Sequence, residues 1–411
     1  MRRPVLRTAM VLVAGFGMAG CWLQPGFDAE RSGFNPLDGV ITPANVAGLH
    51  RVWTAHLGSE VNDPAVSADG VYVTAGGYPD AAKLTLLTRA HGTTRWTVAL
   101  FGAPDPHSVG SPTLVGGTVD VPVPGVSAIV GDSIQVFDAA TGQTRTAIGE
   151  RTFEVIGRDS NLVGTQGECT DAQLCLTSLF VHARVGGASW STILDVTTGA
   201  LSAVTSAAVG PDRVFIGRNA NVQSWPLTPP TNCTAVGGRP LCPPAWSNPT
   251  AAAVAGHPVL SSDDATVFAA AGTSVFALDA ANGKKAWTGT LTATASAAPA
   301  VGNDSLYVPT GNGDLQVFAA NGCGKSTCAP RWTAHTHAGI TRQPAATSGG
   351  LVYTASADGT VRAYPAAGCG KPTCTALWSA ATGSTITGGP VAALGNLYIG
   401  TSDGRLITYS R

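Results

Sequence analysis

Short apolar segments alternate with turn residues along most of the chain, and residues 257–291 show this pattern most clearly. Four apolar segments follow one another there, at 258–260, 266–270, 275–278 and around Trp287. The third and fourth are separated by Asp279-Ala280-Ala281-Asn282-Gly283. Asn and Gly adopt the positive φ angles of tight hairpins at little cost, so the pattern predicts four antiparallel strands joined by hairpins.

The same unit recurs at a nearly constant spacing. Trp246, Trp287, Trp332 and Trp378 lie 41, 45 and 46 residues apart, and Pro258, Pro299, Pro344 and Pro390 keep the same three spacings. Periods of about 40 to 50 residues with several strands each are typical of propeller blades. Similar units begin near Asp63-Pro64 and Ser111-Pro112, and residues 154–202 and 203–247 are assigned to two less regular blades.

The two ends of the chain predict how the ring of blades closes. The last unit, residues 389–411, contains three strands and lacks the fourth, whereas residues 49–57 form an isolated strand that carries Trp53. We therefore predict an all-β fold, an eight-bladed β-propeller of four-stranded antiparallel blades, in which this N-terminal strand completes the last blade. The predicted organisation is a signal peptide (1–20), a lead-in segment (21–48) and a single propeller domain (49–411).

Composition agrees with a folded all-β chain and argues against one class of partner. The chain has 411 residues, of which 44% are hydrophobic and 12% are charged, and its formal net charge is −1. Because no run of basic residues is longer than a pair, the electrostatic footprint of a nucleic-acid-binding protein is missing. We therefore exclude nucleic acid as the partner.

The first 20 residues have the features of an export signal. Three arginines precede an apolar stretch from Ala9 to Ala19, which is too short to span a bilayer. Met18-Ala19-Gly20-Cys21 follows and resembles a bacterial lipobox, although Met18 replaces the usual Leu. We predict that the chain is exported to the bacterial cell envelope, where a lipid on Cys21 holds it to the outer face of a membrane or to the outer membrane. An ordinary signal peptide followed by a coincidental cysteine is the alternative.

The other eight cysteines fall into four close pairs. The pairs are Cys169 with Cys175, Cys233 with Cys242, Cys323 with Cys328, and Cys369 with Cys374. Eight cysteines allow 105 connectivities, but neighbours at the two ends of one hairpin loop favour four local disulfides, as expected of an exported protein. The alternative is a zinc site of four thiolates from the last two pairs.

Six tryptophans are each followed by Thr or Ser and occupy equivalent places in the repeat. They are Trp53, Trp96, Trp246, Trp287, Trp332 and Trp378. A tryptophan buries a large apolar surface and can donate its indole N–H to a backbone carbonyl. We interpret these residues as side chains that dock one blade onto the next, rather than as a surface that stacks on a ligand. The sequence offers no metal site and no catalytic set.

Several of these segments resemble a known repeat. Gly350-Leu351-Val352-Tyr353, and Ala277 to Gly283 followed by Trp287, are similar to the pyrroloquinoline quinone repeat. This repeat occurs in quinoprotein alcohol dehydrogenases and in the propeller lipoprotein of the outer-membrane β-barrel assembly machinery. The enzymes of the family have a vicinal cysteine disulfide, calcium ligands and a catalytic aspartate, and none of these can be matched in this sequence.

The resemblance implies a fold more firmly than a function. We predict a non-catalytic envelope scaffold, a monomer without a cofactor, which binds a protein partner through its loops and its channel mouth. Residues 151–158 and 226–249 depart most from the repeat, and we expect them to form the partner face. The first alternative is an oxidoreductase that uses pyrroloquinoline quinone with calcium, and the second is a carbohydrate-binding envelope module.

Overall fold

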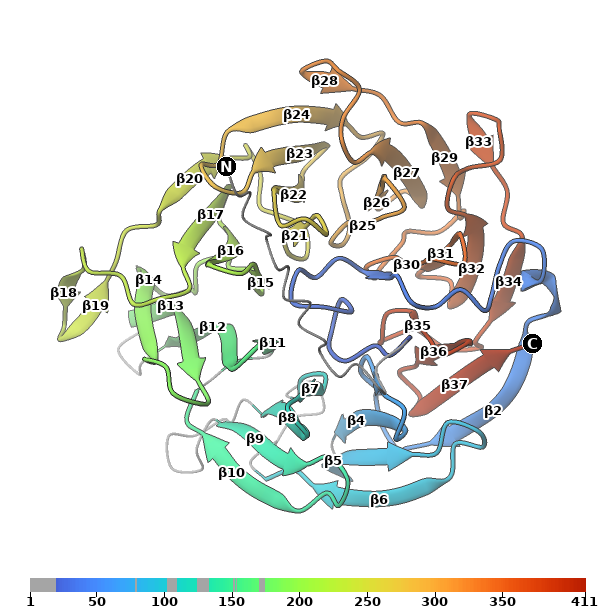
Figure 1. The fold of residues 1–411 in the computed structure, drawn as a ribbon, viewed down its shortest axis with the longest axis horizontal. Helices are drawn as coiled ribbons and strands as arrows, with labels where there is room; N and C mark the ends of the chain where they lie inside the picture. Colours follow the sequence, from blue (N-terminus) through green and yellow to red (C-terminus); the bar gives the residue numbers. More distant parts are fainter. Residues whose placement is uncertain are drawn as a thin grey trace, which may run out of the picture.

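Eight four-stranded antiparallel sheets surround a central axis in the computed structural model (Figure 1). The structure describes residues 20–77, 80–101, 109–123, 133–150, 152, 154–169 and 174–411. The prediction of an eight-bladed propeller is confirmed. In these ranges, no helix is long and apolar enough to cross a bilayer.

The first four blades follow the chain order, each with its first strand nearest the axis. Blade 1 consists of β3 (Ala65–Val66), β4 (Val71–Gly77), β5 (Asp80–Leu87) and β6 (Thr94–Ala99). Blade 2 consists of β7 (Thr113–Val115), β8 (Thr118–Val123), β9 (Ser133–Asp138) and β10 (Thr144–Ile148). Blade 3 consists of β11 (Ile156–Arg158), β12 (Asn161–Cys169), β13 (Leu174–Ala183) and β14 (Trp190–Thr198). Blade 4 consists of β15 (Ala208–Val209), β16 (Arg213–Arg218), β17 (Asn221–Pro226) and β20 (Trp246–Pro249), with a projecting hairpin of β18 (Thr234–Val236) and β19 (Arg239–Leu241).

The last four blades complete the ring. Blade 5 consists of β21 (Val259–Leu260), β22 (Thr266–Ala271), β23 (Ser274–Asp279) and β24 (Lys285–Thr290). Blade 6 consists of β25 (Ala300–Gly302), β26 (Ser305–Pro309), β27 (Asp314–Ala319) and β29 (Trp332–His335). Blade 7 consists of β30 (Ala345–Thr347), β31 (Leu351–Ala355), β32 (Thr360–Pro365) and β34 (Trp378–Ala381). Blade 8 consists of β35 (Val391–Ala393), β36 (Asn396–Gly400), β37 (Arg405–Ser410) and β2 (His50–His56).

Ring closure takes place in blade 8, as the sequence predicts. The N-terminal strand β2 pairs antiparallel with the C-terminal strand β37, and Trp53 lies opposite Thr408. A short 3-10 helix, η1 (Val46–Gly48), precedes β2. The two ends of the propeller are therefore joined by backbone hydrogen bonds, and the blades keep only short edges at the axis and at the rim.

Each blade buries apolar side chains against its neighbours. Between blades 5 and 6, for example, Phe268 and Trp287 pack with Leu306 and Val308 in one cluster. The turns follow the sequence prediction: the side-chain Oδ1 of Asp279 accepts hydrogen bonds from the backbone N–H groups of Ala281 (2.9 Å) and Asn282 (3.1 Å). Such capping by Asp favours the tight turn between the third and fourth strands.

The strand order divides the disc into two faces. Because neighbouring strands are antiparallel, successive turns alternate between the faces. The connection face carries the turns between second and third strands and the links from one blade to the next. The loop face carries the turns between first and second strands and the loops between third and fourth strands.

Candidate functional site

The segment Gly20–Asp38, here called the central segment, lies inside the ring and contacts every blade (Figure 1). Five of its carbonyl oxygens accept hydrogen bonds from backbone N–H groups of the innermost strands or the turns that follow them. These bonds are Leu114 N to Leu23 O (2.8 Å), Val209 N to Ala29 O (2.7 Å), Leu260 N to Glu30 O (2.9 Å), Val301 N to Ser32 O (2.7 Å) and Ala346 N to Gly33 O (2.7 Å).

Contacts with the three remaining blades complete the circle. Trp22 exchanges two backbone hydrogen bonds with Val66 of blade 1 (2.8 and 2.6 Å). Gln24 Oε1 accepts from the backbone N–H of Gly157 in blade 3 (2.9 Å), and Asn35 Nδ2 donates to the carbonyl of Ala392 in blade 8 (3.0 Å). In addition, β1 (Phe34–Asn35) pairs in parallel with β30. The central segment therefore ties all eight blades together and occupies the channel.

Close packing explains why residue 33 of the central segment is a glycine. Gly33 has φ of +64°, and a Cβ there would lie 2.8 Å from both Ala300 Cβ and Pro344 O. A side chain at this position would collide with blades 6 and 7, and glycine also adopts positive φ without strain. Arg31, by contrast, has φ of +60° although it carries a side chain. Such conformations persist where the surroundings hold them in place.

A polar cluster surrounds Arg31 where blades 1, 3 and 5 approach the axis. Its Nη1 lies 2.9 Å from Oε1 of Glu154, and its side chain is 5% exposed. Asp63 accepts a hydrogen bond from the backbone N–H of Gly389, and burial raises the pKa of its carboxyl group. Burial lowers the pKa of His257 well below its usual value, as does the nearby charge of Arg31. The cluster therefore brings together a histidine with a lowered pKa, two carboxyl groups and the Arg31 guanidinium, and the Arg342 guanidinium also acts on Asp63.

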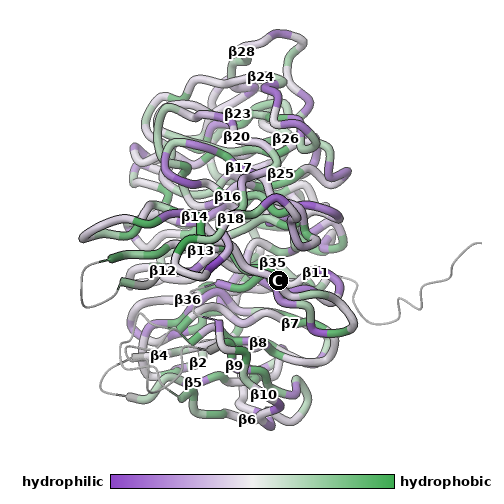
Figure 2. The backbone as a smooth tube through the Cα atoms, turned by 90° about the vertical axis from the view of Figure 1, so that its left-hand side faces the viewer, coloured by the Kyte–Doolittle hydropathy of each residue, from purple (hydrophilic) through white to green (hydrophobic). Residues whose placement is uncertain are grey.

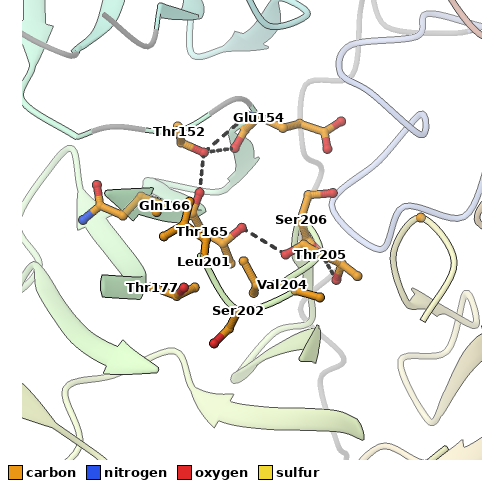
Figure 3. Close-up of a pocket in the computed structure, with 13 residues that line it drawn as sticks. Thr152, Glu154, Thr165, Gln166, Thr177, Leu201, Ser202, Val204, Thr205 and Ser206 are labelled. Atoms are coloured by element: carbon orange, nitrogen blue, oxygen red, sulfur yellow. Dashed lines mark hydrogen bonds between the residues drawn. The ribbon is translucent and has the colours of Figure 1, made fainter. Parts of the chain in front are cut away.

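A pocket of about 430 Å³ opens between blades 3 and 4 on the connection face (Figure 3). Its walls include Thr152, Glu154, Thr165, Leu201 and Thr205. The Thr165 hydroxyl donates to the Thr205 carbonyl (3.0 Å), and the Thr152 hydroxyl lies within hydrogen-bond distance of two carbonyl oxygens. Three of the six lining hydroxyl groups, those of Thr152, Thr165 and Thr205, therefore hold backbone carbonyls. The Ser202 hydroxyl donates to the Asp195 carboxylate, and the buried Thr177 hydroxyl has no hydrogen-bond partner among the described residues.

Apolar side chains are exposed beside this pocket. Leu174, Val196 and Leu201 are 40%, 39% and 45% exposed, and we call them the hairpin patch. The register of β13 and β14 puts Leu174 diagonally opposite Val196 on one side of the blade. Leu201 packs on the other side, which lines the pocket, since a Cβ on Gly167 would lie 2.7 Å from it. Strands β12, β13 and β14 extend well beyond their neighbours at this point (Figure 2). The hairpin patch is thus a raised edge of blade 3 on the connection face, with exposed apolar side chains on both sides of the sheet.

The two segments expected to form one partner face lie apart. Residues 152 and 154–158 begin blade 3 on the connection face, whereas the loop within 226–249 joins a third strand to a fourth and so lies on the loop face. Residues 151 and 153 lie outside the described ranges. The expectation of a single face was wrong, because strand polarity places the two segments at opposite ends of their blades.

The six repeat tryptophans lie on the outer strands and contact the following blade. Five donate the indole N–H to a backbone carbonyl there: Trp53 to Arg89 (2.8 Å), Trp96 to Ala140 (3.1 Å), Trp246 to Ala280 (3.0 Å), Trp287 to Ala320 (3.3 Å) and Trp378 to Leu49 (3.0 Å). The sixth, Trp332, packs on Gly368, where a Cβ would lie 2.7 Å from its ring. Trp190, which we did not predict, donates to Leu227 in the same manner (3.0 Å). Its signal was a tryptophan followed by Ser in the less regular third blade.

The four cysteine pairs are disulfides in the structure. The sulfurs of the last two pairs are therefore not available for the four-thiolate zinc alternative. Cys169–Cys175 closes the β12–β13 hairpin, and the other three close loops between third and fourth strands. Two of these loops add a short parallel strand to the preceding blade, β28 (Thr327–Cys328) on β24 and β33 (Thr373–Cys374) on β29. The third donates from Cys242 N to the Thr192 hydroxyl of blade 3 (2.8 Å).

Cys21 is buried, with 5% of its surface exposed. Burial raises the pKa of its thiol, and the nearby backbone of Ala68 forms a hydrogen bond that lowers it. Residues 1–19, which contain the rest of the predicted signal peptide, lie outside the described ranges. Lipid on Cys21 remains a prediction, and it requires that this residue leave its buried position.

The comparisons place these features among known proteins. Residues 243–364 match the family model described as outer membrane protein assembly factor BamB. The chain is similar to the quinohemoprotein alcohol dehydrogenase of Comamonas testosteroni (TM-score 0.67, 13% identity, 95% of this chain and 80% of that chain). It is also similar to BamB from Moraxella catarrhalis (0.59, 15%, 88% and 98%) and to a europium-containing methanol dehydrogenase (0.70, 13%, 96% and 98%). No curated protein matches the chain.

These findings agree on the architecture and differ in function. At 13 to 15% identity, the similarity to solved structures shows the fold alone. The family match spans β20, blades 5 and 6 and most of blade 7, where the tryptophan repeat is most regular. Residues 243–364 therefore match a pyrroloquinoline-quinone-like repeat family, and the chain as a whole shares the β-propeller fold of the solved structures.

Proposed function

We propose that the chain is a non-catalytic binding module of the bacterial cell envelope, which is held to a membrane by a lipid on Cys21 and binds a protein partner through its connection face. The hairpin patch is the observation that carries this proposal. Its three apolar side chains are each about 40% exposed on a raised edge beside a pocket. Exposed apolar surface on a rigid scaffold is typical of protein-binding sites.

The residues do not fit pyrroloquinoline quinone with calcium, the cofactor of the alternative function. The channel is occupied by the central segment, and Arg31, which is 4% exposed, lies where three blades approach the axis. Among the described residues, no three His, Cys, Asp or Glu side chains are close enough to share a metal ion. We therefore derive no redox step.

Export and lipid attachment are the remaining parts of the proposal. The Gly20 carbonyl accepts hydrogen bonds from Leu394 N (3.1 Å) and Asn35 Nδ2 (3.0 Å). Signal cleavage before Cys21 would remove Gly20 and both of these bonds. Processing would itself loosen the end of the central segment, so that Cys21 could leave its buried position and carry a lipid while Trp22 stays in place.

Cross-linked affinity capture from the native host tests the partner surface. Leu201→Asp puts a charge on the pocket side of the hairpin patch and is expected to lower partner recovery at least fivefold. Leu377→Asp is the matched control, since Leu377 is 40% exposed on the other face of blade 7 and its substitution should leave recovery unchanged. Equal recovery with both variants contradicts the proposal.

Cofactor addition tests the non-catalytic role. The purified chain is mixed with pyrroloquinoline quinone and calcium, and quinone absorbance and alcohol-dependent dye reduction are followed. The proposal predicts that gel filtration removes the quinone and that no dye is reduced. Retained quinone together with dye reduction would overturn the non-catalytic role. The partner surface is tested separately, by the capture experiment.

A further inference from the structure

The central segment enters the disc through the loop face. Its first residue, Gly20, bonds to Leu394 in the turn between the first and second strands of blade 8. Its second residue, Cys21, lies beside Ala68 in the equivalent turn of blade 1. A group attached to Cys21 therefore emerges from the loop face, on the side of the disc opposite the hairpin patch.

Two exposed apolar side chains lie at this entry point. Leu37 and Val40 are 60% and 51% exposed. Val40 packs over the blade 8 turn, since a Cβ on Gly395 would lie 3.0 Å from its Cγ1, and the Leu37 carbonyl lies within 3.5 Å of a Cβ built on Gly20. Apolar side chains beside a lipid attachment point fit the boundary between headgroups and acyl chains, where such groups leave water.

Basic side chains stand on the same face. Lys325 and Lys371 are exposed at the tips of two disulfide-closed loops, and Arg89 is close enough to Cys21 to lower the pKa of its thiol. Asp69, Asp159, Asp212, Asp263 and Asp304 are also exposed in the turns of this face, so the attraction to anionic lipid is confined to the loop tips. Positive charge near an anionic leaflet favours contact over a short range.

We propose that the loop face lies against the membrane, with Leu37 and Val40 in the interfacial layer, and that the connection face with its hairpin patch points away from it. This inference rests on the proposed lipid anchor and adds an orientation to it. A partner would then reach blade 3 from the side remote from the lipid.

Site-directed quenching tests the orientation on the full lipoprotein. Ala90→Cys on the loop face of blade 1 and Ser402→Cys on the connection face of blade 8 are exposed positions in adjacent blades. Each variant is labelled with bimane and placed in vesicles of phosphatidylethanolamine and phosphatidylglycerol that carry nitroxide headgroups. Quenching at residue 90 is expected to exceed that at residue 402 at least threefold. The added changes Leu37→Asp and Val40→Asp should reduce this ratio without changing the melting temperature.

Intact mass separates the two proposals. If the chain is acylated but residue 402 is quenched as strongly as residue 90, the orientation is wrong and the lipid anchor stands. If the chain is not acylated but binds vesicles with residue 90 quenched, the orientation stands and the anchor is wrong. If the chain is neither acylated nor retained by vesicles, both proposals are wrong.

Discussion

The contact between blades 5 and 6 and the contact between blades 2 and 3 solve the same packing problem with different chemistry. In the first, Trp287 packs on Gly322, whose Cβ would lie 2.7 Å from the ring, and the disulfide-closed loop of blade 6 adds β28 to the edge of blade 5. In the second, no tryptophan is available, because none occurs between Trp96 and Trp190. Arg184 of blade 3 instead reaches Asp120 of blade 2 (2.9 Å) and the Thr118 hydroxyl (2.7 Å).

The difference shows which blade contacts depend on pH and charge and which depend on redox conditions. The packing of Trp287 on Gly322 between blades 5 and 6 involves no titratable group. The Arg184–Asp120 pair is buried, with the two side chains 17% and 0% exposed. Burying a carboxylate costs desolvation free energy, and its attraction to the paired guanidinium offsets only part of that cost. The contact between blades 2 and 3 should therefore respond to pH and charge, and the contact between blades 5 and 6 should respond to reduction.

The largest effect is expected from acid titration of Asp120. Burial raises its pKa to about 6, against the opposing effect of Arg184, compared with an ordinary value of 3.8. A carboxyl group with a raised folded-state pKa binds its proton more tightly in the folded state, so stability increases as pH falls from about 7 to 4. The difference between pKa values of 3.8 and about 6 corresponds to about 3 kcal/mol at most. Chemical denaturation of the wild type and of Asp120→Asn at several pH values measures it.

The difference between the pH profiles of the wild type and Asp120→Asn isolates the contribution of the Asp120 carboxyl group to stability. Asp120→Asn should remove about 3 kcal/mol at most of the increase between pH 7 and pH 4. The buried carboxyl groups of Asp28, Asp38 and Asp63, whose pKa values are also raised, contribute to the increase in both proteins. Asp314, Asp358 and Asp403 of the regular blades have lowered pKa values, so their contribution is present at neutral pH and is lost at lower pH in both proteins. Identical pH profiles for wild type and variant would contradict the assignment to Asp120.

An intermediate effect is expected from the disulfide of blade 6. Cys323→Ser with Cys328→Ser opens a six-residue loop and releases the short strand β28 from blade 5. On the chain-entropy model, such a loop contributes about 2 kcal/mol. Thermal unfolding under oxidising conditions measures the loss. Removing the Cys169–Cys175 pair is the control, since that disulfide closes a hairpin within blade 3, and its loss should leave hydrogen exchange in β24 unchanged.

The smallest effect is expected from two tyrosines at equivalent positions. The Tyr307 hydroxyl donates to the Ala366 carbonyl of blade 7 (3.3 Å), whereas the buried Tyr353 hydroxyl has no hydrogen-bond partner among the described residues. Tyr307→Phe should therefore cost about 1 kcal/mol, and Tyr353→Phe should be neutral or slightly stabilising. Urea denaturation of both variants measures the two values, and a larger loss for Tyr353→Phe would contradict this reading of the blade contacts.

The sequence predicts the repeated part of the molecule well, because each repeated feature has a local cause. Asp279 and Gly283 shape a turn in their own blade, and Trp287 packs on Gly322, which has a fixed position in the next repeat. The cysteine pairs are close in sequence, so their bonds could be inferred from spacing. What could not be inferred is that the disulfide loops extend the sheet of the preceding blade, since this depends on packing between blades.

The central segment could not be predicted for a different reason. Residues 20–38 have no repeat and no strand pattern, and their partners range from Val66 to Gly395. The contact of Arg31 with Glu154 joins positions more than 120 residues apart. The residues of the hairpin patch were not predicted, because the sequence shows only that blade 3 is irregular. Their exposure depends on how far β12 and β13 extend.

Amide hydrogen exchange on the mature chain tests the central claim, that residues 21–38 bind all eight blades and occupy the channel. The account predicts slow exchange at Val209, Leu260, Val301 and Ala346, whose N–H groups donate to this segment. Replacing Ala29, Glu30, Ser32 and Gly33 by proline should accelerate exchange at these four amides without affecting Tyr398 in β36. Rapid exchange at the four amides in the unmodified chain would show that the segment does not occupy the channel and would contradict the account.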